Sequence, residues 1–118
     1  MNTRSCKAKG RRLQQFVRDA LRTVFSGKLE NGDIESRQMG GAGTDIILSP
    51  SAQKLIPFDF EVKNQEKLNI WSAIQQARYN TSEGRIPLLI FSRNNSEKYA
   101  VIEFSTLLEL LYGIHSDK

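Results

Sequence analysis

An alternating run near the middle of the chain constrains the fold more than any other feature. From Ile56 to Val62 every second residue is apolar, whereas Asp59, Glu61 and Lys63 occupy positions of the opposite parity. Side chains two residues apart in a β-strand point to the same face. The run therefore predicts a strand with one face in the core and with two carboxylates and an ammonium group together on the other.

The remaining apolar pattern predicts an α/β fold. Apolar residues at three- and four-residue spacings indicate an amphipathic helix over residues 11–25, which Ser26-Gly27 ends. The other predicted elements are strands at 34–38, 45–49, 87–92 and 99–104, and helices at 68–79 and 107–112. Together they give the order αβββαββα, which predicts a mixed five-stranded sheet flanked by helices. We expect Trp71 to be a core residue rather than a base-stacking platform, and the last helix to be buried in the core rather than to contribute to a dimer.

Charge is distributed unevenly along a chain whose 118 residues are expected to form one domain, 1–118. Residues 1–28 hold eight basic side chains and one acidic one, whereas the other ninety residues hold nine basic and twelve acidic ones. Lysine and arginine supply most sequence-independent affinity for nucleic acid. The asymmetry thus predicts a basic N-terminal arm and helix that contact phosphate. The alternative is a solvated helix face that only keeps the protein soluble.

Cysteine content and apolar runs bear on where the protein resides. Cys6 is the only cysteine, so no disulfide can form within the chain. The longest apolar runs fall far short of the roughly 20 residues that a membrane span needs. No apolar segment of a secretory signal follows the basic N-terminus. We expect a cytoplasmic protein, in the host cytoplasm if it is viral, that has no membrane partner.

Two separate segments carry the candidate catalytic groups. Gly43-Thr44-Asp45 opens one predicted strand, and fifteen residues separate Asp45 from Glu61 in the next. If these strands pair, the two carboxylates converge beside Lys63. Two carboxylates with open positions suit Mg²⁺, which predicts a site that cuts phosphodiesters. The alternative is that Glu61 and Lys63 form an exposed ion pair of little energetic consequence.

The basic helix, the Gly-rich turn into Asp45, the Glu61-Val62-Lys63 strand and the following helix resemble the PD-(D/E)xK nuclease superfamily. The resemblance is greatest to its small Holliday-junction-resolvase-like members, and Thr44 stands where the motif has proline. It implies a restriction-endonuclease-like core in which Asp45 and Glu61 hold Mg²⁺, with Mn²⁺ as an alternative. Lys63 would then position the attacking water or neutralise charge on the phosphate.

The resemblance also implies an acidic residue on the first helix, four positions after the glycine of Lys9-Gly10. This chain has Gln14 there, and a neutral amide oxygen is a weaker ligand for a hard cation than a carboxylate. Asp59 shares the predicted strand face with Glu61 and is an alternative metal ligand.

On the helix after the central strand, Gln75 and Tyr79 are similar to a Gln-x-x-x-Tyr motif in some members of the superfamily. The resemblance implies that Gln75 lies near the metal and takes part in catalysis, with Gln76 as a competing candidate. The alternative is an ordinary polar position beside a core aromatic residue.

Several residues are candidates for contact with a nucleic acid. Gly41 and Gly43 permit backbone conformations that would let the chain approach a sugar-phosphate strand closely. Arg37, just upstream, is a candidate phosphate contact, and a surface arginine is the alternative. The full predicted set is Lys7, Lys9, Arg11, Arg12, Arg37, Gly41 and Gly43.

The combined pattern predicts a metal-dependent endodeoxyribonuclease that acts on branched DNA such as four-way junctions. The resemblance implies a homodimer, because a two-fold symmetric junction takes two matched cuts, and it implies no organic cofactor. Two alternatives are a nuclease of linear duplex or single-stranded DNA and a non-catalytic nucleic-acid-binding module with a degenerate site.

Overall fold

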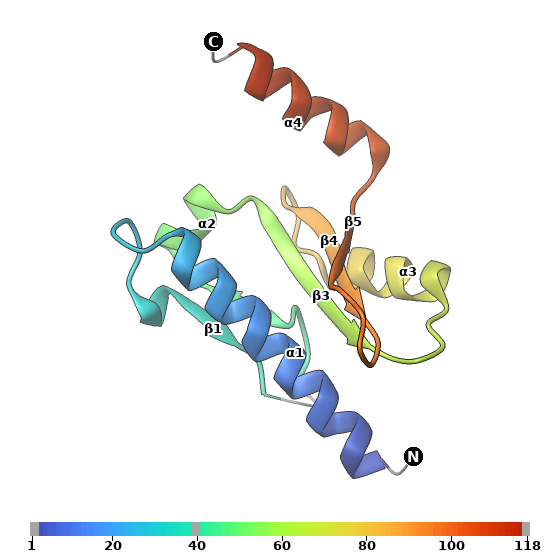
Figure 1. Cartoon of the computed structure of the whole chain (residues 1–118). Helices are drawn as coiled ribbons and strands as arrows, with labels where there is room; N and C mark the ends of the chain where they lie inside the picture. Colours follow the sequence, from blue (N-terminus) through green and yellow to red (C-terminus); the bar gives the residue numbers. More distant parts are fainter. Residues whose placement is uncertain (1–2, 39–40, 117–118) are drawn as a thin grey trace.

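The computed structural model describes residues 3–38 and 41–116 and shows an α/β arrangement of helices around two small sheets (Figure 1). Its elements are α1 (Thr3–Val24), η1 (Asn31–Asp33), β1 (Ile34–Ser36), β2 (Ile46–Leu48), α2 (Pro50–Leu55), β3 (Phe58–Asn64), α3 (Ile70–Asn80), β4 (Ile86–Ser92), β5 (Tyr99–Val101) and α4 (Phe104–Ser116). The predicted class and the flanking helices are confirmed. None of these helices is both long and apolar enough to cross a bilayer.

The five strands do not form the single sheet that the sequence predicts. β1 and β2 pair in antiparallel fashion, while β3 pairs in parallel with β4, which pairs in antiparallel fashion with β5. One residue, Asp45, joins the two sheets: its N–H donates to the Phe60 carbonyl at 2.9 Å, and its own carbonyl accepts from the Arg37 N–H at 2.8 Å. Strand pairing does not continue beyond this residue, so the two sheets stay separate.

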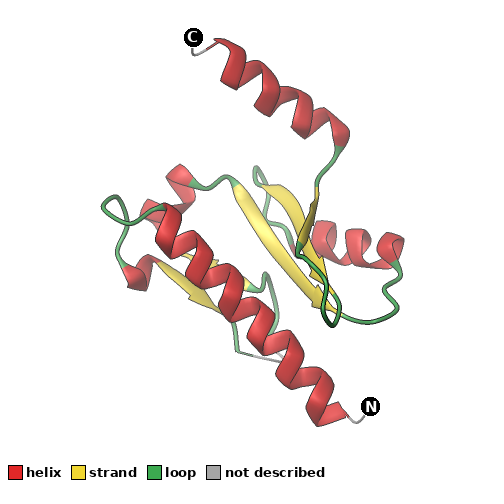
Figure 2. Ribbon diagram, in the orientation of Figure 1, coloured by secondary structure: helices red, strands yellow, loops and turns green. Residues whose placement is uncertain are grey.

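The core lies between α1 and the two sheets. Leu13 and Val17 of α1 pack with Phe60 and Val62 of β3, and with buried residues of β1, β2 and α2. Residues of opposite parity in β3 point the other way, toward α3, whose Asn80 bonds the Glu61 side chain. Both faces of β3 are therefore covered, with α1 on one side and α3 on the other (Figures 1 and 2).

Local signals explain where several helices begin and end. Gly27, at φ +89°, follows the end of α1, as the Ser26-Gly27 pair predicts. α2 was not predicted: Ser49 caps it by accepting the Ala52 N–H at 3.1 Å, and Pro50 occupies its first turn. The turn-forming residues of this segment thus start a helix rather than a loop.

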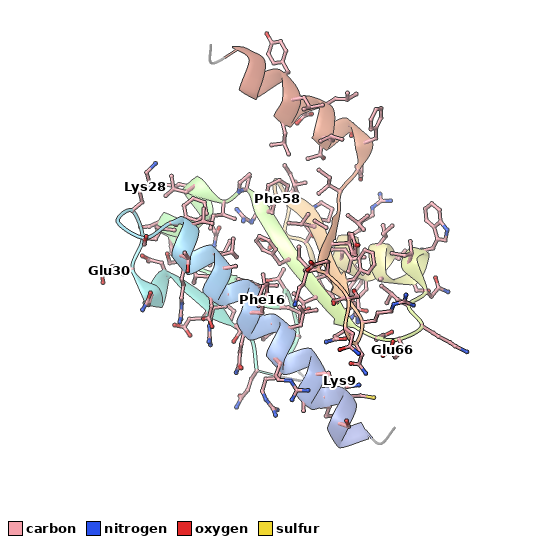
Figure 3. The ribbon with its side chains drawn as sticks, viewed as in Figure 1. Lys9, Phe16, Lys28, Glu30, Phe58 and Glu66 are labelled. Carbon is pink, nitrogen blue, oxygen red and sulfur yellow. The ribbon has the colours of Figure 1, made fainter. Side chains whose placement is uncertain are left out.

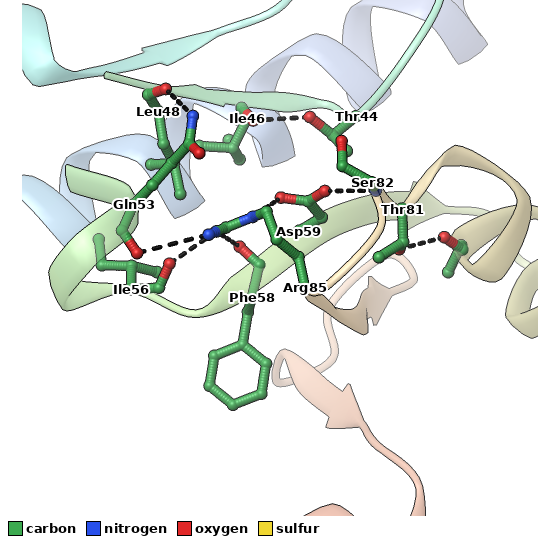
Figure 4. A network of polar contacts seen from close by, with 11 residues as sticks. Thr44, Ile46, Leu48, Gln53, Ile56, Phe58, Asp59, Thr81, Ser82 and Arg85 are labelled. Carbon is green, nitrogen blue, oxygen red and sulfur yellow. Dashed lines mark hydrogen bonds and ion pairs between the residues drawn. The ribbon is translucent and has the colours of Figure 1, made fainter. Parts of the chain in front are cut away.

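Asp59 belongs to a buried network that connects α2, β3 and the loop after α3 (Figure 4). Its Oδ1 accepts from Arg85 Nε at 2.5 Å, and its Oδ2 accepts from the Ser82 N–H at 2.9 Å. Arg85 Nη2 also donates to the carbonyls of Ile56 and Phe58, at 2.6 and 2.7 Å. Both oxygens of Asp59 are therefore engaged in holding the chain around the start of β3.

α4 and Trp71 correct the expectation that they are buried. α4 follows β5 and projects away from the body of the domain (Figures 1 and 2). Its Phe104, Leu108, Leu111 and Tyr112 side chains are 50–73% exposed, and Trp71 on α3 is 79% exposed. Apolar composition alone predicts burial, but β5 ends the sheet and leaves no further element to cover these side chains.

Candidate active site

Asp45 lies at the junction of the two sheets with its carboxylate directed along β3. Its Oδ2 accepts the Val62 N–H at 2.7 Å, one residue from Glu61. Among the described residues nothing donates to Oδ1. Since every fully buried side-chain oxygen in the described part of the chain has a partner, Oδ1 reaches solvent. The carboxylate is thus fixed by one oxygen and open at the other.

Glu61 is almost fully buried and takes part in two polar contacts. Its Oε1 accepts from Asn80 Nδ2 at 3.1 Å, and its Oε2 lies 3.6 Å from Lys63 Nζ. The Glu61 side chain is 4% exposed and the Lys63 side chain 21% exposed. The ion pair of the alternative is thus present, but it is not exposed as expected, because Glu61 is buried and is also bonded to Asn80 of α3.

The electrostatics of Asp45 indicate that its carboxylate lies close to the Glu61 carboxylate and the Lys63 ammonium group. Burial raises the pKa of Asp45 from 3.8 to about 6, and the nearby negative charge of Glu61 acts in the same direction. The Val62 hydrogen bond and the positive charges of Lys63 and Arg37 partly offset this rise. A carboxylate that is costly to ionise in the folded protein, beside a second carboxylate, favours a cation between or near them.

Arg37 explains why glycine occupies positions 41 and 43. Its Nε donates to the Thr44 carbonyl at 2.6 Å, so its side chain lies along the loop that leads to Asp45. A Cβ at position 41 would lie 3.0 Å from Arg37 Cγ and Cδ, and one at Gly43, where φ is +100°, would lie 3.1 Å from Nη2. The Arg37 side chain makes the close approach to the backbone that these glycines permit, and it thereby fixes the loop.

Gln14 is 5% exposed on the face of α1 that packs on β3. Among the described residues its amide has no hydrogen-bond partner. Because fully buried polar atoms all have partners in that part of the structure, the Gln14 amide also reaches solvent. A neutral amide at this position carries no charge that would need a counterion.

Four other predicted site residues lie away from this cluster or are already engaged. Gln75, Gln76 and Tyr79 are exposed on the outer face of α3, and Tyr79 is 89% exposed, so it is not the core aromatic residue of the alternative reading. They line a shallow depression together with Ser72 and Arg78. Both oxygens of Asp59 accept hydrogen bonds, from Arg85 and from the Ser82 N–H, so Asp59 belongs to the structural network around the start of β3.

Asn80 is the site residue that the sequence did not reveal. It lies one helical turn beyond the Gln75–Gln76 pair, and Ala73 and Ala77 on the same face are buried against β3. The two small residues allow α3 to approach the strand closely. Their spacing, with Asn80 in the next turn, was the available signal that the Asn80 side of the helix faces Glu61.

The predicted phosphate contacts on α1 are available to a ligand. Lys7, Lys9, Arg11 and Arg12 form no ion pair with any described residue. In the second half of the helix, by contrast, Arg18 pairs with Asp19, and Arg22 pairs with Asp19 and Glu35. The unpaired positive charge is thus concentrated in the N-terminal half of α1.

A metal ion at this cluster would have two carboxylates as its side-chain ligands. Among the described residues no three His, Cys, Asp or Glu side chains gather as a metal cage. Asp45 and Glu61 nevertheless fit Mg²⁺, which commonly uses one or two carboxylates and takes its other ligands from water and substrate phosphate. The open Oδ1 and the raised pKa of Asp45 are the observations that suit a cation.

The chain matches no protein-family model, no curated protein and no solved structure.

The raised pKa gives a testable effect on stability. Because the folded state binds a proton to Asp45 up to about pH 6 while the unfolded state releases it near 3.8, this group stabilises the fold less as pH rises through that window. We expect Asp45→Asn to exceed the wild type in unfolding free energy above pH 6, by up to about 3 kcal/mol, with the difference shrinking toward pH 4. Urea unfolding at several pH values measures it.

Asp33→Asn is the control of opposite sign. Hydrogen bonds from the Ser49 hydroxyl and the Glu30 N–H lower the pKa of Asp33, so this change should destabilise the protein near neutral pH. An Asp45→Asn protein less stable than the wild type at pH 7.5 would contradict the account of Asp45.

Proposed function

We propose that the chain is a metal-dependent endodeoxyribonuclease that hydrolyses phosphodiester bonds in branched DNA such as four-way junctions. The observation that carries the proposal is the Asp45 carboxylate, bonded to Val62 through one oxygen, open at the other and close enough to Glu61 and Lys63 for their charges to shift its pKa. This is the constellation that the resemblance to PD-(D/E)xK nucleases implies.

Each residue of the cluster has a role in this reaction. Mg²⁺ or Mn²⁺ held by Asp45 and Glu61 would supply Lewis-acid chemistry toward a water and the scissile phosphate. Lys63 holds a positive charge 3.6 Å from Glu61, where it can orient the water or balance charge that develops on phosphate. Asn80 orients the Glu61 carboxylate by donating to Oε1.

Substrate binding would use the unpaired cations of α1 and the loop before Asp45. Arg11 and Arg37 line a cleft of about 530 Å³ with Gln15, Ser36 and Gln38. Arg37 thus both fixes the glycine loop and contributes positive charge beside Asp45. The exposed Cys6, without a disulfide partner, fits a reducing cytoplasmic setting.

A second copy of the chain is the partner we assign to α4. A helix of 13 residues is marginal on its own, and this one exposes most of its large apolar side chains. Beside its first turn a cleft of about 490 Å³ is lined by Trp71, Ile74, Pro87 and Val101 among others. Two copies that exchange α4 into each other's cleft would form a closed two-fold contact, as two matched cuts require.

Cleavage of labelled substrates tests the nuclease proposal. We expect the wild type with Mg²⁺ to cut a four-way junction in preference to linear duplex and single strand. Asp45→Asn and Lys63→Ala should each lower the rate by about a hundredfold or more. Lys54→Ala, on exposed α2, is the matched control and should cut normally. Equal cutting of linear duplex would favour the alternative nuclease, and binding without cleavage would favour the non-catalytic module.

The dimer is tested separately by light scattering during size-exclusion chromatography. The molar mass of the wild type measured by light scattering should be twice the chain mass. Leu108→Glu with Leu111→Glu should elute as a monomer because charges oppose burial of the α4 face. Ser105→Glu on the same helix is the control. A wild type that stays monomeric at tens of micromolar would contradict the assignment of α4.

A further inference from the structure

A second cleft, of about 360 Å³, lies on the opposite flank of α1, between that helix and the loop that joins β4 to β5. In Figure 3, Lys9 and Phe16 lie along α1 on the side that this loop approaches. The residues that line the cleft are Lys9, Arg12, Leu13 and Phe16 of α1, Asn64 of β3, and Ser92, Arg93, Asn94, Asn95, Ser96 and Lys98 of the loop. Its charged residues are all positive.

Internal contacts hold the loop in this position. The buried Ser92 hydroxyl lies within 3.4 Å of the Arg93, Ser96 and Glu97 carbonyls, and the Ser96 N–H donates to the Arg93 carbonyl at 3.2 Å. Asn95 adopts a left-handed φ of 61°, which tightens the turn. Lys98 Nζ lies 4.5 Å from the centre of the Phe16 ring, so the loop also contacts α1 directly.

The four cations of this cleft are uncompensated. Within the described residues Lys9, Arg12, Arg93 and Lys98 form no ion pair. Like charges held around one small cleft repel each other, and a bound anion relieves that repulsion. Asn64 and the two loop asparagines add neutral donors of the kind that contact phosphate oxygens.

The position of the cleft indicates that the anion it binds is part of a polymer. Asn64 directly follows Lys63, so the cleft adjoins the end of the strand that carries the proposed catalytic lysine. The Arg11–Arg37 cleft on the other flank of α1 is also basic. We propose that the α1/β4–β5 cleft binds a backbone phosphate of DNA beside the scissile phosphodiester, with Arg93 and Lys98 as its principal contacts. This inference rests on the proposed nuclease function.

The test measures DNA binding without cleavage. In the Asp45→Asn background, with EDTA present, the affinity for a labelled four-way junction is measured over a range of salt concentrations. Adding Arg93→Ala or Lys98→Ala should weaken binding by about three- to tenfold and reduce the slope of log affinity against log salt by about one. Lys98→Arg should restore binding. Lys54→Ala, an exposed lysine on α2 outside the cleft and outside the basic N-terminal segment, should leave the slope unchanged.

Each outcome bears on the inference. Slopes of the Arg93 and Lys98 variants equal to that of the Lys54 control would overturn it. Inorganic phosphate that displaces the junction at low millimolar concentration would also overturn it, by identifying a site for free phosphate. If the wild type never cleaves DNA but these variants lose binding, the cleft stands while the nuclease proposal fails. If the wild type cleaves DNA normally but the Arg93 and Lys98 variants keep their binding, the nuclease proposal stands while the cleft fails.

Discussion

The hydrogen bond from the Val62 N–H to Asp45 is the interaction on which the arrangement of the site depends. Together with the bond from the Asp45 N–H to the Phe60 carbonyl, it connects the β1–β2 hairpin to β3 through Asp45. The same bond directs the Asp45 carboxylate toward Glu61 and leaves its other oxygen open. Joining the sheets at this residue has an energetic cost, because burial beside Glu61 raises the pKa of Asp45 to about 6.

Three surrounding features keep that carboxylate in place. Arg37 passes over Gly41 and Gly43 and bonds the Thr44 carbonyl, which fixes the approach to Asp45. Asn80 of α3 holds Glu61 from the other side of the strand. α1 covers the apolar face of β3. It also contributes unpaired basic side chains to a cleft on each of its own two flanks. Fold and site are thus built from the same contacts.

How much the sequence predicts depends on whether a feature is local. The period of two in β3 places Glu61 and Lys63 on one face, and the structure bears this out at 3.6 Å. The same rule cannot separate Glu61 from Asp59, because only the distant Arg85 determines that Asp59 is structural. Asn80 and the division of the strands into two sheets likewise depend on tertiary packing. Apolar composition alone does not predict that α4 is exposed.

The central claim is that Asp45 and Glu61 share one divalent cation. The most direct measurement is the titration of the Asp45 carboxyl by carbon-13 NMR with and without Mg²⁺, with the Asp33 carboxyl, which Ser49 and Glu30 bond, as internal reference. A bound cation favours the ionised form, so we predict that Mg²⁺ lowers the apparent pKa of Asp45 from about 6 and leaves the titration of Asp33 unaltered. An Asp45 titration that is the same with and without Mg²⁺ would contradict a shared cation.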